Sequence, residues 1–81
     1  MHPKTTERPT FDAAAIDLGP LNDKVSASPR ETWKALSIGS TRGYELLGSG
    51  ELVSYHEGKA RRILVSSIRA YLARRLAEER A

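Results

Sequence analysis

Three glycines in the segment TRGYELLGSGEL, residues 41–52, restrict this part of the chain to a short helix that ends in a turn. Gly48 and Gly50 fit a helix C-terminus, where a left-handed residue is favoured. Gly43 lies further inside, where glycine costs about 1 kcal/mol relative to alanine. Its presence there predicts that another backbone approaches the helix closely.

This helix is predicted to begin near Ser40. Tyr44 and Leu47 are three residues apart and should share the face that points into the core, with Leu46 beside them. The opposite face and the first turn are left with polar side chains, which are Ser40, Thr41, Arg42 and Glu45.

The preceding helix has a clear start signal in the four residues SPRE. Ser28 is an N-cap, Pro29 stands at the first helical position and Glu31 at the third, which together form a capping box. The helix is predicted to end near Ser37, followed by a turn that contains Gly39.

After the glycines, two short β-prone runs at residues 53–56 and 62–65 flank the link EGKA, residues 57–60. This pattern predicts a β-hairpin. An isolated hairpin is only marginally stable, so side chains must pack on the helices, and those predicted to do so are Val53, Ile63 and Val65. The tip and return strand are basic, with Lys59, Arg61 and Arg62.

The last helix is predicted to start at Ser66 or Ser67 and to run to the end of the chain. Its apolar stripe has helical spacing and consists of Ile68, Tyr71, Leu72 and Leu76. The charged residues assigned to its wetter faces are Arg69, Arg74, Arg75, Glu78, Glu79 and Arg80. The expected fold is therefore mainly α with a small β-hairpin.

Residues 1–24 differ from the rest in containing Pro3, Pro9 and Pro20 together with turn signals. They are predicted to form an arm that is either flexible or docked on the domain or on a neighbouring molecule, whereas residues 25–81 form the domain. From Ser28 onward the chain has ten basic and six acidic residues. This balance weakly favours a polyanionic partner.

Composition excludes several classes of function. Eighty-one residues permit one small domain, and the chain has no cysteine and only two histidines, so neither a thiolate nor a histidine metal site is expected. The sequence has no run of about 20 apolar residues and no signal peptide, which favours a cytoplasmic protein. Without a nucleophile motif or phosphate loop, neither an enzyme nor a cofactor is expected.

Residues 28–72, SPRETWKALSIGSTRGYELLGSGELVSYHEGKARRILVSSIRAYL, resemble the small winged helix-turn-helix domains of phage excisionases and their MerR-like relatives. The most specific part is LSIGSTRGYELLGSGEL followed by the basic hairpin and VSSIRAYL. The sequence departs from the family at Trp33, where a small residue is common, and at Gly43, where a larger one is usual. It departs also at Ser40 or Gly48, where a basic residue is usual, and at Val53, where proline is frequent.

The resemblance implies a winged helix-turn-helix fold, with a two-stranded wing and a C-terminal helix. It also implies a recombination directionality factor, which is not a catalyst. Such proteins bind several adjacent sites near a prophage attachment site in a bacterial host, bend the DNA, and make the integrase carry out excision. The expected partners are double-stranded DNA, the phage integrase and neighbouring copies of the same protein.

The resemblance places the second helix in the major groove and the hairpin along the adjoining minor groove. Arg42 is a candidate for a bidentate bond to guanine, and Glu45 either accepts from cytosine or steers Arg42. The complete set for the major groove is Ser40, Thr41, Arg42 and Glu45, for the wing Lys59, Arg61 and Arg62, and for phosphates Arg30 and Tyr44. Alternatively, Ser40 and Thr41 only cap the helix, and the hairpin arginines only solubilise it.

Two other functions remain open at this point. A plain transcription regulator uses the same domain, typically as a dimer on a palindrome, although the last helix is too short for a long coiled coil. An interaction module or antirepressor would fold normally and show no salt-sensitive binding to DNA.

Overall fold

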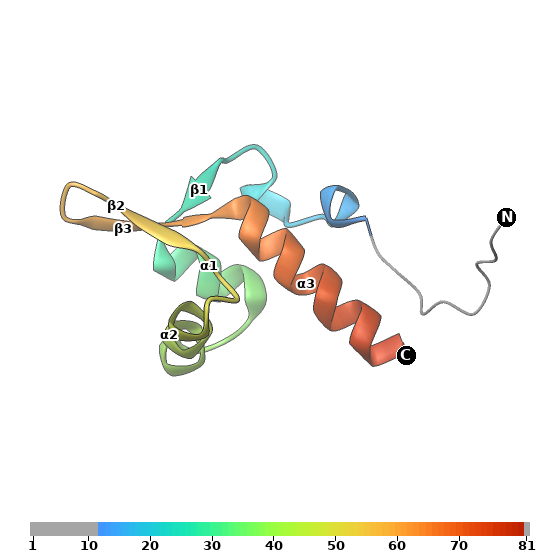
Figure 1. Ribbon diagram of the computed structural model, residues 1–81. Coiled ribbons are helices and arrows are strands. Elements are labelled where there is room, and N and C mark those ends of the chain that lie inside the picture. Colours follow the sequence, from blue (N-terminus) through green and yellow to red (C-terminus); the bar gives the residue numbers. More distant parts are fainter. Residues whose placement is uncertain (1–11, 81) are drawn as a thin grey trace, which may run out of the picture.

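The computed structural model describes residues 12–80, so residues 1–11 of the predicted arm lie outside the described part. It is mainly helical, with three α-helices and one three-stranded antiparallel sheet (Figure 1). In chain order the elements are η1 (Ala13–Ala15), η2 (Gly19–Leu21), β1 (Ser26–Ala27), α1 (Pro29–Leu36), α2 (Ser40–Ser49), β2 (Ser54–Glu57), β3 (Ala60–Leu64) and α3 (Val65–Arg80). The predicted order of helix, turn, helix, hairpin and helix is confirmed.

The capping box of α1 is present as predicted. The Glu31 amide donates to Ser28 Oγ at 3.1 Å, and the Ser28 amide donates to the Glu31 carboxylate at 2.9 Å. The helix ends at Leu36, and its C-cap Ser37 adopts a left-handed conformation with φ of 58°. Gly39 has an extended backbone and serves as the N-cap of α2, so the left-handed residue of this turn is a serine.

The buried face of α2 differs from the prediction. Tyr44 is 50% exposed, whereas Leu46 is completely buried and Leu47 is partly buried. The face of α2 that points into the core contains Gly43 and Leu46, which are three residues apart. Tyr44 therefore lies on the exposed side of the helix. Gly50 is the left-handed C-cap with φ of 85°, as predicted, but Gly48 lies inside the helix.

The sheet has a third strand that the sequence did not predict. Its order is β1-β3-β2, and β1 pairs with β3 through the register Ala27↔Ile63. The hairpin of β2 and β3, residues 54–64, is called the wing below. Glu57 pairs with Ala60, so the connecting turn is the two residues Gly58 and Lys59 and not the four expected. Gly58 has φ of 62°, as the first central residue of a II′ hairpin turn requires.

The core joins the base of the sheet to the helices. Ile63 and Val65 are buried as predicted, but Val53 is 48% exposed and Leu52 is buried in its place. The last helix begins at Val65, and Leu76 of its predicted stripe is 39% exposed. The buried apolar residues are Leu18, Leu21, Ala27, Trp33, Leu46, Leu52, Ile63, Val65, Ile68 and Tyr71.

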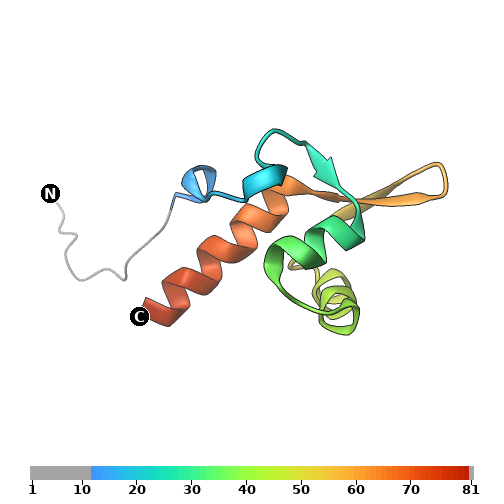
Figure 2. The ribbon, with the colours of Figure 1, turned by 180° about the vertical axis from the view of Figure 1, so that it is seen from behind.

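Residues 12–24 pack against the first turns of α3, as Figure 2 shows from behind. Leu18 and Leu21 are buried in the core. Arg69 of α3 was predicted to lie on a solvent-exposed face of the helix, but its side chain is partly buried. Its guanidinium donates to the Ile16 carbonyl at 3.3 Å and to the Asn22 side chain at 3.0 Å.

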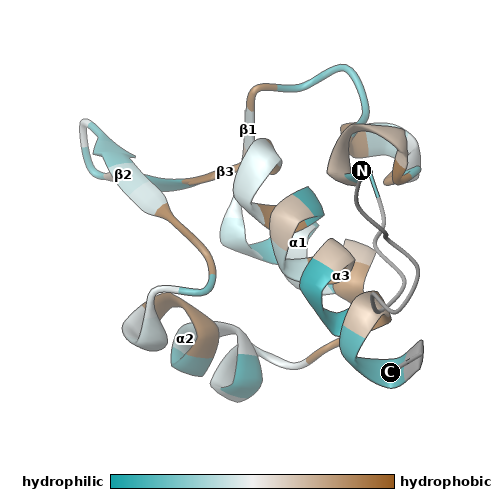
Figure 3. Cartoon of the chain, turned by 45° about the vertical axis from the view of Figure 1, so that its right-hand side comes forward, coloured by the Kyte–Doolittle hydropathy of each residue, from teal (hydrophilic) through white to brown (hydrophobic). Residues whose placement is uncertain are grey.

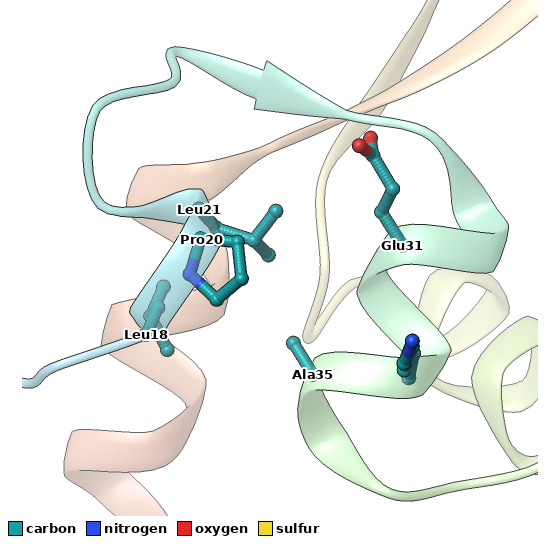
Figure 4. A pocket seen from close by; sticks show the side chains of 6 residues that line it. Leu18, Pro20, Leu21, Glu31 and Ala35 are labelled. Carbon is teal, nitrogen blue, oxygen red and sulfur yellow. The ribbon is translucent and has the colours of Figure 1, made fainter.

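A hollow of about 460 Å³ lies between η2 and α1 (Figure 4). Leu18, Pro20 and Leu21 line one side of it, while Glu31, Lys34 and Ala35 of α1 line the other. This hollow is therefore formed by the packing of the N-terminal segment against α1, and it includes none of the residues predicted to contact DNA.

Candidate nucleic-acid interface

The second helix and the wing are adjacent in the chain and are exposed at one end of the molecule. Residues 50–53 alone connect α2 to β2. Figures 1 and 2 show the wing extending away from the helices at the end opposite to the C-terminal end of α3. In Figure 3, α2 and β2 lie on the same side of the molecule, joined by a connection that is hydrophobic only in its second half, next to β2.

Four residues form the outermost line of α2. Thr41, Tyr44, Glu45 and Gly48 are spaced by three or four residues, so they share one face of the helix. All four are exposed, and they lie opposite to the buried Gly43 and Leu46. These four residues are called the α2 ridge below.

Ser40 and Thr41 occupy the first turn of α2 without capping it. The N-cap is Gly39, and no side chain bonds to the free amides at this helix start. The alternative in which the two hydroxyl groups serve as caps is therefore wrong. Both residues are exposed, which leaves their hydroxyl groups accessible to a ligand of the helix.

Arg42 lies beside the ridge, on the flank of α2 nearest α3. Its Nη1 donates to Glu45 Oε1 at 3.4 Å, and the side chains of the pair are 50% and 61% exposed. The Glu45 carboxylate, followed by the Tyr71 hydroxyl of α3, raises the pKa of Arg42. Glu45 is thus placed to orient the guanidinium, and an exposed pair of this kind can exchange partners at little cost.

Tyr44 lies on the side of the α2 ridge away from Arg42, where Trp33 of α1 contacts it. The rings of Tyr44 and Trp33 meet edge to face, with centroids 5.4 Å apart and an interplanar angle of 73°. Trp33 is largely buried between α1 and α2. The Tyr44 ring is therefore held on one side by the buried Trp33 ring, while half of its surface remains exposed.

The basic residues of the wing differ in their contacts. Lys59 is exposed in the turn at the tip. Arg61 is partly buried on β3, and its Nη1 donates to Ser54 Oγ of β2 at 2.8 Å. His56 pairs with Arg61 across the hairpin and is exposed. Cationic groups are thus distributed from the tip of the wing toward its base.

Arg62 is bonded to the unpredicted strand β1. Its Nε donates to Ser26 Oγ at 3.2 Å and its Nη2 donates to the Ser26 carbonyl at 3.0 Å. The Tyr55 hydroxyl of β2 also bonds to Ser26 Oγ, at 3.0 Å. Ser26 therefore connects all three strands through side chains, and this is a feature that the sequence analysis missed because a two-residue strand carries no periodic signal.

Arg30, predicted to contact phosphate, is exposed on the first turn of α1. The ridge and the wing are formed by α2, β2 and β3, so Arg30 belongs to a different element from the other candidates. Within residues 12–80, no cluster of histidine and acidic side chains could hold a metal ion. No helix in that range is long and apolar enough to cross a membrane.

Comparison with known proteins found one similar sequence at a significant level. Over 61 residues the chain is 38% identical to a protein named "Probable excisionase" from Saccharopolyspora erythraea. This similarity supports the excisionase resemblance. The aligned region covers 75% of this chain and 62% of that relative, so the chain spans less than two thirds of the relative's length. No family model matches the chain, and no solved structure matches it.

Proposed function

We propose that this chain is an excisionase: a non-catalytic protein that binds DNA near a prophage attachment site and directs an integrase toward excision. The observation that carries the proposal is the exposure of α2 and of a basic wing at one end of the molecule, in a chain similar to a protein named as an excisionase. We further propose that the fold is a winged helix-turn-helix of the MerR-like type.

In this proposal α2 enters the major groove, which is wide enough for one α-helix and displays a distinct pattern for each base pair. Arg42 leaves Glu45 and bonds guanine O6 and N7, while Glu45 accepts from a neighbouring cytosine. Ser40 and Thr41 bond a base edge or a phosphate. Tyr44, held by Trp33, presents its hydroxyl to a phosphate on one side of the groove.

The wing follows the adjoining minor groove, whose negative potential attracts cations when the groove is narrow. Lys59 and Arg61 reach into it. Arg62 contributes its charge at the base of the wing, where its bonds to Ser26 also fix the angle of the hairpin. Arg30 adds a phosphate contact from α1.

A single domain of this size buries little surface on DNA, so several copies at adjacent sites are expected to assist one another. The resulting bend in the DNA would bring the integrase and its sites together. The protein would act in the cytoplasm of the bacterial host, where the prophage DNA lies.

The experiment that tests the proposal is a gel shift with circularly permuted fragments from the attachment region of the source genome. An excisionase gives several successive complexes whose mobility depends on the position of the site, because each bound copy bends the DNA. The alternative function, a small winged-helix transcription regulator, gives one complex with little dependence on position. Binding that is absent at low salt would contradict both.

A further inference from the structure

Gly48 is the one member of the α2 ridge without a side chain, and nothing within residues 12–80 explains it. Its backbone is not left-handed, in contrast to the C-cap Gly50. A Cβ built on Gly48 would meet no atom within 4 Å among the described residues. Glycine in a helix is less stable than alanine, so the fold itself would gain from a side chain here.

Gly43, in the same helix, has the opposite environment. A Cβ at Gly43 would lie 2.6 Å from ring atoms of Trp33, so the packing of α1 on α2 requires glycine there. Gly50 is required by its φ of 85°. Gly48 has neither of these reasons, and its face of the helix is directed away from the core.

We infer that Gly48 is the point at which a base edge of the bound DNA approaches the α2 backbone most closely. The inference rests on the proposed function, and it adds a contact that none of the charged or hydroxyl side chains provides. A glycine allows close approach of a ligand to the backbone, as at other sites where helices meet bulky partners.

The position of Gly48 favours a base edge over a phosphate. It lies in the last turn of α2, the carbonyl end of the helix, which carries a partial negative charge although the Leu46 and Leu47 carbonyls accept bonds from the amides of residues 50–52. A phosphate would be repelled there. The major-groove edge of a base instead offers amino hydrogens on adenine or cytosine and the methyl group of thymine, and all of these can approach the carbonyl end of a helix.

The test compares the wild-type chain with Gly48→Ala and Gly48→Leu, using anisotropy on a duplex that carries the wild-type footprint and on a scrambled duplex. Thermal unfolding is measured on the same samples. Both variants are expected to unfold at a temperature equal to or higher than the wild type, since each side chain enters open space. Affinity for the footprint duplex should fall about tenfold for alanine and further for leucine, and affinity for the scrambled duplex should stay within about twofold.

Full affinity of Gly48→Ala for the footprint duplex would overturn the inference, and so would an equal loss on both duplexes. A fall in unfolding temperature would also overturn it, because glycine would then serve the fold. If the wild-type chain binds neither duplex, the proposed function fails, and this outcome is distinct because it does not depend on the substitution.

Discussion

The ring of Trp33 occupies the space in which a side chain at position 43 would begin. A Cβ built on Gly43 would lie 2.6 Å from three ring atoms of Trp33, closer than carbon atoms can pack. The large side chain of Trp33 on α1 thus packs directly against Gly43 on α2, which has no side chain. Trp33 and Gly43, two of the positions at which the sequence departs from the family pattern that it resembles, therefore lie in the same helix contact.

This relationship predicts a reversal of sign in a double-mutant cycle. Gly43→Ala should lower the free energy of unfolding by about 1–3 kcal/mol, because the added methyl overpacks the contact. In a Trp33→Leu background, Gly43→Ala should leave the free energy of unfolding unchanged or raise it by up to about 1 kcal/mol. That value is the advantage in helix propensity of alanine over glycine. Urea unfolding followed by circular dichroism measures both values. Equal destabilisation in the two backgrounds would show that the ring is not the cause.

Ser26 is predicted to hold the wing in position. Ser26→Ala removes the acceptor for the Tyr55 hydroxyl and for Nε of Arg62, while the bond from Nη2 to the carbonyl remains. Amide exchange in residues 54–64 should accelerate by about five- to a hundredfold, since two such bonds are lost and each contributes roughly 0.5–1.5 kcal/mol. Ser66→Ala, at an exposed position of α3, is the matched control. Unchanged exchange in the wing would mean that strand pairing alone determines its position.

Arg42→Ala is expected to weaken DNA binding by roughly 1–3 kcal/mol and to relax preference at one base pair. The loss comes from the bidentate contact, since the exposed pair with Glu45 contributes little to folding. Binding to a set of duplexes with single base changes measures the preference. The control is Arg75→Ala, which removes the same charge from α3. A uniform loss across the set would assign Arg42 to phosphate.

Arg61→Ala is expected to weaken binding to all sequences alike. If about five cationic groups of the wild-type protein contact phosphates, the slope of log K against log salt concentration is near −4 to −5. Because Arg61→Ala removes one of these contacts, the slope of the variant should be less steep by about one. Affinities between about 50 and 200 mM salt provide both slopes. The same slope in the two proteins would remove Arg61 from the interface.

The local structure of residues 17–22 should depend on pH through Asp17. The Asn22 amide, then the Gly19 amide and the charge of Arg69, lower the pKa of Asp17. A lowered pKa stabilises the folded arrangement above the ordinary aspartate value of about 4, and this contribution is lost as the pH falls through the folded pKa. Amide signals of residues 18, 19, 21 and 22 should therefore shift and broaden below pH about 4.

Asp17→Asn separates this effect from that of Glu31, whose pKa is also lowered, by the Ser28 amide and then by Lys24. In the variant, the signals of residues 18–22 should no longer respond to acid, while those at the start of α1 still should. A response at residues 18–22 that persists in Asp17→Asn would place its origin elsewhere.

The sequence predicted those features that depend on local signals. The capping box at Ser28 and the left-handed Gly50 are each determined by a few adjacent residues, and both are present. The hairpin is present as well, but with a two-residue turn in place of the predicted four-residue link. The exposed polar side chains of α2 followed from the same helix spacing.

Features determined by tertiary contacts were not predictable in this way. Tyr44 was assigned to the core because its spacing from Leu47 is helical, but the bulk of Trp33 fills that side of the contact. β1 exists because β3 offers it a partner, as Ser26 and Ala27 alone carry no strand pattern. For the same reason, the bonds of Arg62 to Ser26 could not be inferred from the residues.

The most direct measurement of the central claim is a dimethyl sulfate footprint of the wild-type chain on its binding site. This reagent reports guanine N7 in the major groove and adenine N3 in the minor groove. Binding by α2 and the wing predicts protection of N7 positions and, on the adjoining minor-groove segment, of N3 positions, with the N3 protection lost in a Lys59→Ala, Arg61→Ala double variant. Protection confined to one groove, or an N3 pattern that survives in the double variant, would contradict the account.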